Sequence, residues 1–223
     1  MSSGKLTSEE RKHHDFVQSL MKWHEKNRRL FPWRRNKSPY RVLIAEILLQ
    51  RTPANRVSTF FPRFVDKFPD PPSIASTSID DLEEFLKPMG LKKRAEWLVK
   101  LMKGICEKYN GQIPNQEDKL KNLPGVGRYT ARAVMSFGFK KDVAIVDINV
   151  VHVLSRVFGL PERNKRPHAD VEIWALTTAL IPKGGGPEFN EALLDFAAKI
   201  CTKNPSCHKC PLKHLCDYYR TSL

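Results

Sequence analysis

The sequence lacks the long hydrophobic run that a membrane-spanning helix needs. No stretch approaches the roughly 20 apolar residues that cross a bilayer. The first 14 residues, MSSGKLTSEERKHH, contain no apolar signal region, and the chain has neither internal repeats nor a low-complexity tail. These absences argue against a membrane, secreted or repeat protein. We therefore expect a soluble, intracellular protein of the cytoplasm or nucleoid.

Alternating runs of β-branched residues are also scarce, and apolar residues recur instead at intervals of three and four. That spacing is typical of helices, so the sequence predicts an all-α fold joined by short Gly- and Pro-rich loops. The expected helices cover Ser8–Asn27 with Ser8 as a possible cap, Pro39–Gln50, Ala54–Phe64, Ser73–Ala75, Ile79–Phe85, Lys92–Tyr109, Gln116–Lys121, Gly127–Phe137, Ile148–Phe158, Ala169–Leu180 and Glu188–Ile200.

Acidic residues are few beside the basic ones. The 223 residues include 24 Asp and Glu against 38 Lys and Arg, for a formal net charge of +14. Such a surface favours a polyanionic partner, and nucleic acid is the first candidate. A merely basic surface or one that associates with membranes is the alternative, and charge alone does not decide between them. The hydrophobic fraction of 41% is enough for a core in one or two lobes.

Cysteine is rare except near the C-terminus. Four of the five cysteines, Cys201, Cys207, Cys210 and Cys216, lie within 16 positions, and two of them form a C-x-x-C pair. Four thiolates at this spacing can hold one tetrahedral ion or one cubane cluster, so the spacing leaves zinc and iron–sulfur both open. Cys106, far upstream in an apolar helix, is expected to be a small core residue.

A second motif is Leu123-Pro-Gly-Val-Gly127-Arg-Tyr-Thr-Ala131, in which two glycines lie between two predicted helices. Glycine allows close approach of a backbone to a phosphate, and the start of the following helix offers free N–H groups. The motif predicts a phosphate-binding hairpin. An ordinary tight turn between helices is the alternative.

Two carboxylates stand in apolar surroundings. Asp147 follows the run Val143-Ala-Ile-Val146 and precedes a helical pattern, so we expect it to cap that helix, a role compatible with catalysis. Glu46 lies inside the apolar helix segment VLIAEILL. A carboxylate there needs a buried partner or a catalytic purpose, unless it occupies a rim position that faces solvent.

In this order, the elements resemble the helix-hairpin-helix superfamily of endonuclease III and adenine DNA glycosylases. The resemblance also includes Phe31-Pro-Trp33, Glu46-Ile-Leu-Leu-Gln-Arg-Thr52, Met89-Gly-Leu91 and Val146-Asp-Ile-Asn149, and it covers nearly the whole chain. Within the superfamily the sequence is most similar to thymine-DNA mismatch glycosylases of the MIG type.

The resemblance implies a two-lobed glycosylase fold with a [4Fe-4S] cluster on the terminal cysteine loop. A six-helix barrel domain with the hairpin would cover residues 29–136, and residues 1–28 with 137–223 would form the cluster domain. The loop departs from the family in one respect. Cys201 and Cys207 enclose five residues where six are usual.

Tyr129, two residues after Gly127, is the most informative position. Bifunctional members of the endonuclease III group have a lysine there, whose amine forms a Schiff base with the sugar and allows strand cleavage. A tyrosine cannot form one, and the thymine mismatch enzymes have tyrosine. The resemblance therefore implies a monofunctional glycosylase, without AP-lyase activity, that removes thymine or uracil mispaired with guanine.

The same resemblance implies roles for individual residues. Asp147 would stabilise the positive charge that develops on the sugar, Glu46 would hydrogen-bond or protonate the leaving base, and Tyr129 would line the pocket. Gln50 and Arg51 would fill the gap left by the extruded nucleotide, and Leu91 would wedge the opposite strand. The hairpin contacts to DNA would come from Gly125, Gly127, Arg128 and Thr130.

Three rival functions stay open at this stage. One is an adenine DNA glycosylase acting on adenine opposite guanine or 8-oxoguanine, which the lack of a further domain after Cys216 disfavours. Another is a helix-hairpin-helix module that binds DNA without catalysis, and the third is a lyase of the endonuclease III kind. The expected partner is double-stranded DNA carrying a mismatched or damaged base, bound by a monomer.

Overall fold

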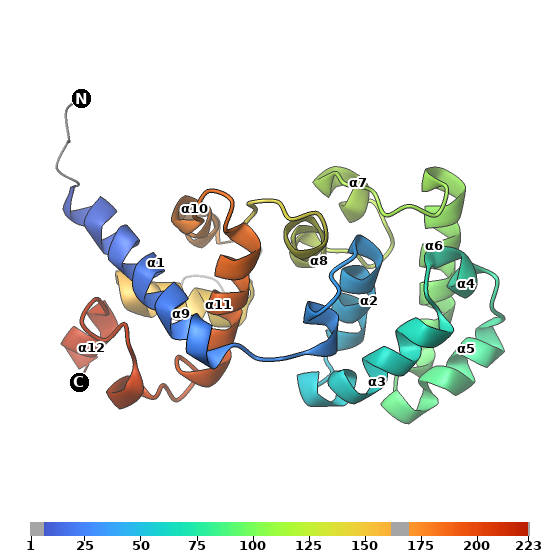
Figure 1. Cartoon of the computed structure of the whole chain (residues 1–223), viewed down its shortest axis with the longest axis horizontal. Coiled ribbons are helices and arrows are strands. Elements are labelled where there is room, and N and C mark those ends of the chain that lie inside the picture. Colours follow the sequence, from blue (N-terminus) through green and yellow to red (C-terminus); the bar gives the residue numbers. More distant parts are fainter. Residues whose placement is uncertain (1–6, 162–169, 223) are drawn as a thin grey trace. The chain divides into compact units, whose positions relative to one another are not determined.

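The protein is all-helical, as predicted (Figure 1). The computed structural model describes residues 7–161 and 170–222, and no β-strand occurs among them. The α-helices are α1 (Ser8–Asn27), α2 (Pro39–Leu49), α3 (Ala54–Lys67), α4 (Pro71–Ala75), α5 (Ile79–Leu86), α6 (Ala95–Tyr109), α7 (Glu117–Lys121), α8 (Arg128–Ala133), α9 (Ile148–Phe158), α10 (Val171–Leu180), α11 (Gly186–Lys199) and α12 (Asp217–Ser222). The shorter turns are η1 (Pro32–Arg34), η2 (Lys87–Met89), η3 (Lys92–Arg94), the π-helical η4 (Val134–Gly138) and η6 (Cys207–Lys209).

The start of α1 corrects one prediction, because Thr7 and not Ser8 is the N-cap. The Thr7 hydroxyl accepts a hydrogen bond from the Glu10 amide, and the Glu10 carboxylate accepts one from the Thr7 amide at 2.8 Å. Such a reciprocal box needs a carboxylate or amide three residues after the cap. With Ser8 as the cap, that position would fall on Arg11, which has no acceptor.

Most other predicted helices differ from the observed ones by one to three residues at an end, and the helix predicted from Lys92 begins as the separate turn η3. The segment predicted as one helix over Gly127–Phe137 is divided into α8 and the wider turn η4. That turn ends at Gly138, where a Cβ would lie 2.7 Å from Cα of Pro39, so only glycine fits. The helix predicted from Ala169 has its described start at Val171, with Asp170 as its N-cap, and Ala169 lies outside the described residues. Helix α12 was not predicted.

A distant aspartate sets the start of α11. Asp142 accepts hydrogen bonds from the amides of Gly184, at 2.6 Å, and Gly186, at 2.9 Å. These two bonds hold the pKa of Asp142 below its usual range. A Cβ on Gly186 would lie 2.7 Å from Cα of Asp142, so the glycine run is needed for this contact.

The chain separates into two compact units, residues 1–29 with 141–223 and residues 30–140. In the second unit, α2 packs against α3, α8 and η4, and α6 packs against α4 and α5. Its core is rich in aromatic and branched side chains, among them Leu43, Ile44, Phe61, Phe64 and Leu98, all fully buried. No helix in the described part of the chain is both long and apolar enough to cross a membrane.

In the first unit, α11 packs against α1 and α9, and α12 packs against α9. The amphipathic faces of these helices meet at Phe16, Val153, Phe189 and Phe196, which are fully buried. Burial of large side chains of this kind contributes about 1.5–3 kcal/mol each, which explains why α1, α9 and α11 stay together.

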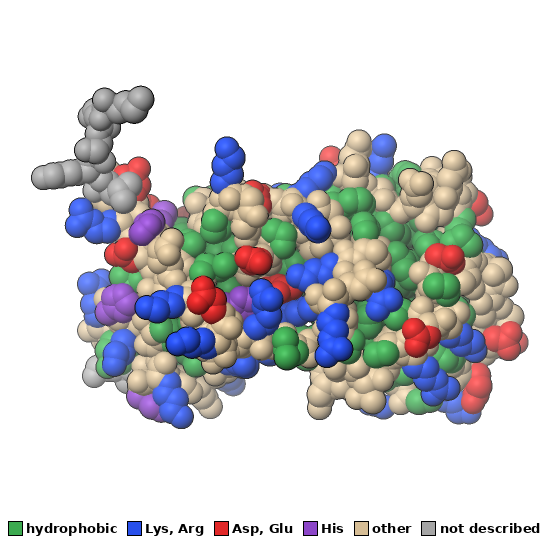
Figure 2. All heavy atoms as spheres, viewed as in Figure 1, with side chains coloured by type: hydrophobic (Ala, Val, Ile, Leu, Met, Phe, Trp, Pro, Cys, Tyr) green, Lys and Arg blue, Asp and Glu red, His purple; other side chains and the backbone are tan. Residues whose placement is uncertain are grey.

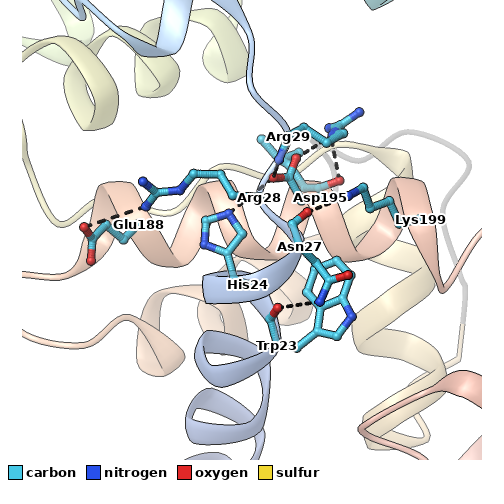
Figure 3. Close-up of polar contacts among 9 residues, drawn as sticks. Trp23, His24, Asn27, Arg28, Arg29, Glu188, Asp195 and Lys199 are labelled. Atoms are coloured by element: carbon cyan, nitrogen blue, oxygen red, sulfur yellow. Dashed lines mark hydrogen bonds and ion pairs between the residues drawn. The ribbon is translucent and has the colours of Figure 1, made fainter.

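A buried polar cluster ties the end of α1 to α11 (Figure 3). Asp195 on α11 has no exposed surface, and its Oδ2 accepts from the backbone amide of Arg29 at 2.9 Å and lies 3.2 Å from Nε2 of His24. Its Oδ1 accepts from Nε of Arg29 at 2.5 Å. Nearby, Lys199 donates to the carbonyl oxygen of Asn27 at 2.6 Å. One carboxylate thus fixes the point where the chain leaves α1.

We expect Asp195→Asn to lower the free energy of unfolding by about 3–5 kcal/mol, because the partly buried Arg29 guanidinium and the buried His24 ring lose a charged partner. Urea denaturation followed by circular dichroism measures this loss. Glu188→Gln is the matched control, since Glu188 is exposed and lies 4.0 Å from Arg28. Its effect should stay below about 1 kcal/mol. Equal losses in the two variants would contradict the role of Asp195.

Candidate active site

Glu46 and Tyr129 lie on helices that pack against each other. Glu46 is on α2, where its neighbours Ala45 and Ile47 are buried while Glu46 itself is only half-buried. Tyr129 lies in the first turn of α8 and is also half-buried. Helices α2 and α8 pack against each other within residues 30–140. The Glu46 side chain is therefore neither fully buried nor fully exposed to solvent.

Asp147 is the N-cap of α9, as predicted. Its Oδ1 accepts a hydrogen bond from the Val150 amide at 2.8 Å. Its Oδ2 accepts one from the side-chain amide of Asn149 at 2.9 Å. The carboxylate is half-buried and is held in one orientation by both contacts, and Oδ2 keeps lone pairs for a further donor. Sequence reasoning quoted Asn149 within a motif but gave it no role.

The hairpin consists of α7, the turn at Asn122–Gly127 and α8. Leu123 and Val126 are buried and anchor the turn, while Pro124, Gly125 and Gly127 are exposed. Gly125 has φ +69°, and a Cβ there would lie 2.4 Å from the Trp97 ring. Gly125 is therefore required by its backbone conformation and by a close neighbour.

Gly127 differs from Gly125 in both respects. Its φ is −83°, a value open to any residue, and a Cβ at this position would meet nothing within 4 Å. The packing of the protein therefore does not require glycine here. Open space beside the backbone is what close approach of a phosphate would need.

The other residues predicted to contact DNA differ in how far they are exposed. Arg51 is exposed and adopts a left-handed backbone with φ 56°, and Gln50 is half-buried at the end of α2. Arg128 is half-buried, and burial, followed by the charge of Arg132, lowers its pKa. Leu91 and Thr130 are buried, at 8% and 6% exposure. Their side chains are therefore not at the surface in this conformation.

The four C-terminal cysteines line one cavity of about 20 Å³, together with Arg156 and Tyr218. Burial raises the pKa of the Cys201 and Cys216 thiols, and raises that of Cys210 to about 11. Arg156 of α9 donates to Sγ of Cys201 at 3.5 Å and to the carbonyl oxygen of Thr202 at 2.6 Å. No three His, Cys, Asp or Glu side chains in the described ranges converge on a single-ion site. Cys106, expected in the core, is only half-buried.

Three residues near these sites escaped sequence reasoning: Arg94, Trp97 and Arg156. Each makes its contacts across at least 27 residues of sequence. In the sequence, only their residue types could have pointed to these roles. Partly buried arginine and tryptophan side chains usually need a hydrogen-bond partner.

Lys and Arg side chains are spread over the face drawn in Figure 2, on both units, and acidic side chains are interspersed with them. On this face the basic side chains are therefore not confined to one end. Such a distribution suits a long polyanion better than a single small anion.

An all-helical protein with a glycine hairpin of this kind is a helix-hairpin-helix protein, and the comparison with known families agrees. Residues 44–178 match the HhH-GPD superfamily of base excision DNA repair proteins. The match covers more than half of the chain, so the protein belongs to that superfamily.

Individual relatives match over most of the chain. It is 36% identical over 211 residues to the thymine/uracil-DNA glycosylase of Pyrobaculum aerophilum, covering 92% of each chain. It is 34% identical over 206 residues to the adenine DNA glycosylase of Buchnera aphidicola subsp. Baizongia pistaciae, covering 92% of this chain and 58% of that one.

Two solved structures share the fold. A thermostable thymine-DNA glycosylase matches with a TM-score of 0.90 and 36% identity, covering 96% of this chain and 99% of that one. A non-covalent endonuclease III–DNA complex matches with a TM-score of 0.80 and 26% identity, covering 97% of this chain and 98% of that one. Both matches confirm the predicted all-helical fold of the endonuclease III kind.

The two hairpin glycines should respond differently to alanine. We expect Gly125→Ala to lower the free energy of unfolding by at least about 1–2 kcal/mol, since it forces a left-handed alanine against Trp97. Gly127→Ala should change stability by less than about 1 kcal/mol. It should weaken DNA binding about tenfold, because the methyl group occupies the open space beside the backbone. Thermal unfolding and fluorescence anisotropy with a labelled duplex measure the two effects. Unchanged DNA affinity in Gly127→Ala would count against a hairpin that binds phosphate.

Proposed function

We propose that the protein is a monofunctional DNA glycosylase that hydrolyses the N-glycosidic bond of thymine or uracil mispaired with guanine. The observation that carries this proposal is the similarity to a thymine/uracil-DNA glycosylase over 92% of both chains. Tyr129 supports the monofunctional part, because the first turn of α8 carries a phenol where the endonuclease III group has an amine. A phenol cannot form the Schiff base that precedes strand cleavage.

The first step is binding and extrusion. The basic surface and the exposed turn at Gly125–Gly127 hold the phosphate backbone without reading sequence. A mismatched nucleotide costs least to unstack, so mispairing itself contributes selectivity. Gln50 and Arg51, at the end of α2, occupy the vacated gap. Leu91 acts as the wedge in the opposite strand, and this requires it to leave the buried position described above.

The second step is cleavage of the bond between base and sugar. Loss of the base leaves positive charge on the sugar, and a nearby carboxylate stabilises that transition state. Asp147 provides the carboxylate, held by the Val150 amide and by Asn149. The same group orients the attacking water.

Glu46 and Tyr129 are the other two residues of the proposed mechanism. Glu46, half-buried on an apolar helix, donates a hydrogen bond or a proton to the leaving base and so neutralises the charge that the base would carry. Tyr129, on the helix that packs against α2, contacts the base or the sugar. All three residues act on the same nucleotide after it has left the duplex.

We further propose that Cys201, Cys207, Cys210 and Cys216 hold a [4Fe-4S] cluster. The four thiols line one cavity, and four cysteine thiolates are the usual ligands of such a cluster. A single tetrahedral zinc would need all four sulfurs within about 2.3 Å of one point. When bound, the cluster cross-links the terminal loop and takes no part in base removal. Arg156 supports the loop through the Thr202 carbonyl.

In this proposal residues 29–136 are the barrel domain with the hairpin, and residues 1–28 with 137–223 are the cluster domain. The substrate is double-stranded DNA, bound by a monomer. The similarity to an adenine DNA glycosylase keeps adenine opposite guanine or 8-oxoguanine as the second candidate substrate.

The test is base release by the purified protein from duplexes with G·T, G·U, G·A and 8-oxoguanine·A pairs, with and without alkali. We expect cleavage of the G·T and G·U strands only after alkali, because the protein leaves an intact abasic site. No protein should be trapped on DNA by borohydride. Release of adenine would contradict this proposal and favour an adenine DNA glycosylase. Strand cleavage without alkali would show that the protein has lyase activity.

In the same assay, Asp147→Asn should reduce base release by at least about a hundredfold, because the amide cannot offset the charge on the sugar. Its stability should change little, since asparagine caps helices as well as aspartate does. Asp170→Asn is the matched control, because Asp170 caps α10 in the same way and lies in the same unit. That variant should retain activity. Near-normal base release by Asp147→Asn would remove Asp147 from the mechanism.

The cluster proposal has its own measurement. Purified protein should contain iron and acid-labile sulfide in a ratio of about 1:1, with little zinc. Cys210→Ser should lose both, because it removes one of four ligands, whereas Cys106→Ser should keep both, since Cys106 lies on α6 and does not line the cavity. Stoichiometric zinc without sulfide would replace the cluster by a structural zinc site.

A further inference from the structure

The segment that leads into α6 holds the end of α2 through Arg94. The guanidinium of Arg94 donates from Nη1 to the carbonyl oxygen of Ile47 at 2.7 Å and to that of Leu48 at 3.5 Å, and from Nη2 to that of Gln50. The last carbonyls of a helix have no partner inside it. A side chain 47 residues away in sequence therefore satisfies the C-terminus of α2.

These bonds fix the loop that follows α2. The Gln50 carbonyl oxygen accepts from Arg94 and also from the Thr52 hydroxyl at 3.3 Å. The next residue, Arg51, has φ 56°, a left-handed conformation that costs a non-glycine residue about 1–2 kcal/mol. A backbone in this conformation persists only where its surroundings hold it. The hydrogen bonds to Gln50 provide that restraint.

Arg94 also holds a second loop. Its backbone amide donates to the carbonyl oxygen of Leu91 at 2.8 Å, and the Leu91 amide donates to the Leu86 carbonyl at 3.3 Å. The same residue thus holds the Gln50–Arg51 loop through its side chain and the Leu91 loop through its main chain. All of these residues lie within residues 30–140, so their relative positions belong to one compact unit.

Arg94 makes these contacts without a carboxylate partner in the described part of the chain, because its hydrogen bonds go to carbonyl oxygens. Burial, followed by the neighbouring charge of Arg51, lowers its pKa. The charge of Arg51 therefore repels that of Arg94, and the hydrogen bonds of Arg94 described above include no carboxylate. A phosphate backbone near Arg51 would relieve that repulsion.

One turn further along α6, Trp97 holds the hairpin. Its Nε1 donates to the carbonyl oxygen of Pro124 at 2.9 Å. Its ring occupies the space where a side chain at Gly125 would lie. Arg94 is the N-cap of α6 and Trp97 lies in the first turn of α6, so the two residues stand three positions apart at the same end of this helix.

We propose that Arg94 and Trp97 form one brace at the start of α6 that sets the relative positions of the Gln50–Arg51 loop, the Leu91 loop and the hairpin. Both are positioning residues, because they act through the loops and not on the base or sugar. The inference rests on the proposed function for what the loops do to DNA. Arg94 governs extrusion of the mismatched nucleotide, and Trp97 governs the grip on the backbone.

The experiment compares Arg94→Lys and Arg94→Gln with Lys93→Gln. Lysine keeps the charge but cannot span three carbonyls. Lys93 is exposed and adjacent, so its substitution removes a charge near the same loops without removing these bonds. Three quantities are measured on the full-length protein: affinity for matched and G·U duplexes, kcat and KM for base release, and 2-aminopurine fluorescence beside the mismatch as a reporter of extrusion. Urea denaturation confirms that each variant is folded.

We expect Arg94→Lys to bind a matched duplex as the wild type does, while its preference for the mismatch and its kcat fall by about tenfold to a hundredfold. The extrusion signal falls with them. Arg94→Gln should show the same losses and weaker binding to both duplexes. Lys93→Gln should bind both duplexes more weakly and show a salt slope smaller by about one, but keep mismatch preference and kcat. The brace is refuted if Arg94→Lys behaves as the wild type, or if Arg94→Gln behaves as Lys93→Gln.

Trp97 is tested with Trp97→Phe and Trp97→Ala. Alanine should weaken binding to matched and mismatched duplexes alike and leave kcat unchanged, because only the hairpin is released. Phenylalanine retains part of the ring contact and should restore part of the affinity. Unaltered affinity in folded Trp97→Ala would overturn this half of the brace. Failure of the wild type to release any base would refute the proposed function instead, and the binding and fluorescence measurements would still test the brace.

Discussion

Burial of helix α2 is the constraint around which residues 30–140 are arranged. The helix is apolar on almost every side, and a helix of this kind must be enclosed by other elements. Enclosure removes water from its ends, so their main-chain groups need other partners. The Ser38 hydroxyl accepts from the Arg41 amide at the start, and Arg94 donates to carbonyls at the end. Glu46 is the carboxylate left half-exposed on this helix, which gives it a chemical setting unlike that of a surface acid.

The other unit uses aspartates to fix its main chain. Asp142 accepts from two glycine amides before α11, Asp147 caps α9, and Asp195 accepts from the amide of Arg29. In each case a carboxylate is oriented by backbone N–H groups, whose positions vary little. The hydrogen bond from the Val150 amide caps the start of α9 and also orients the Asp147 carboxylate. One geometry of Asp147 therefore serves both roles. Its role as a helix cap does not argue against its proposed role in catalysis.

The sequence predicted much of the fold because its signals are local. Periodic apolar residues placed α1 and α9 with their observed bounds, and the cap at Asp147 was expected from the pattern around it. The hairpin was recognised from its glycines, although only Gly125 is required by the packing of the protein. The roles of individual site residues came from the resemblance to a family and stay predictions. Leu91 shows why, since the expected wedge is buried in the described conformation.

By itself the sequence determined the all-helical class, the hairpin, the clustered cysteines and the superfamily. Only the tertiary structure decided which side chains hold these parts in place. Arg94 reaches Ile47 across 47 residues, Trp97 reaches Pro124 across 27, and Arg29 reaches Asp195 across 166. Periodicity, caps and turn residues act within windows of a few positions. A contact between distant residues depends on how whole helices pack, and no local pattern along the chain encodes it.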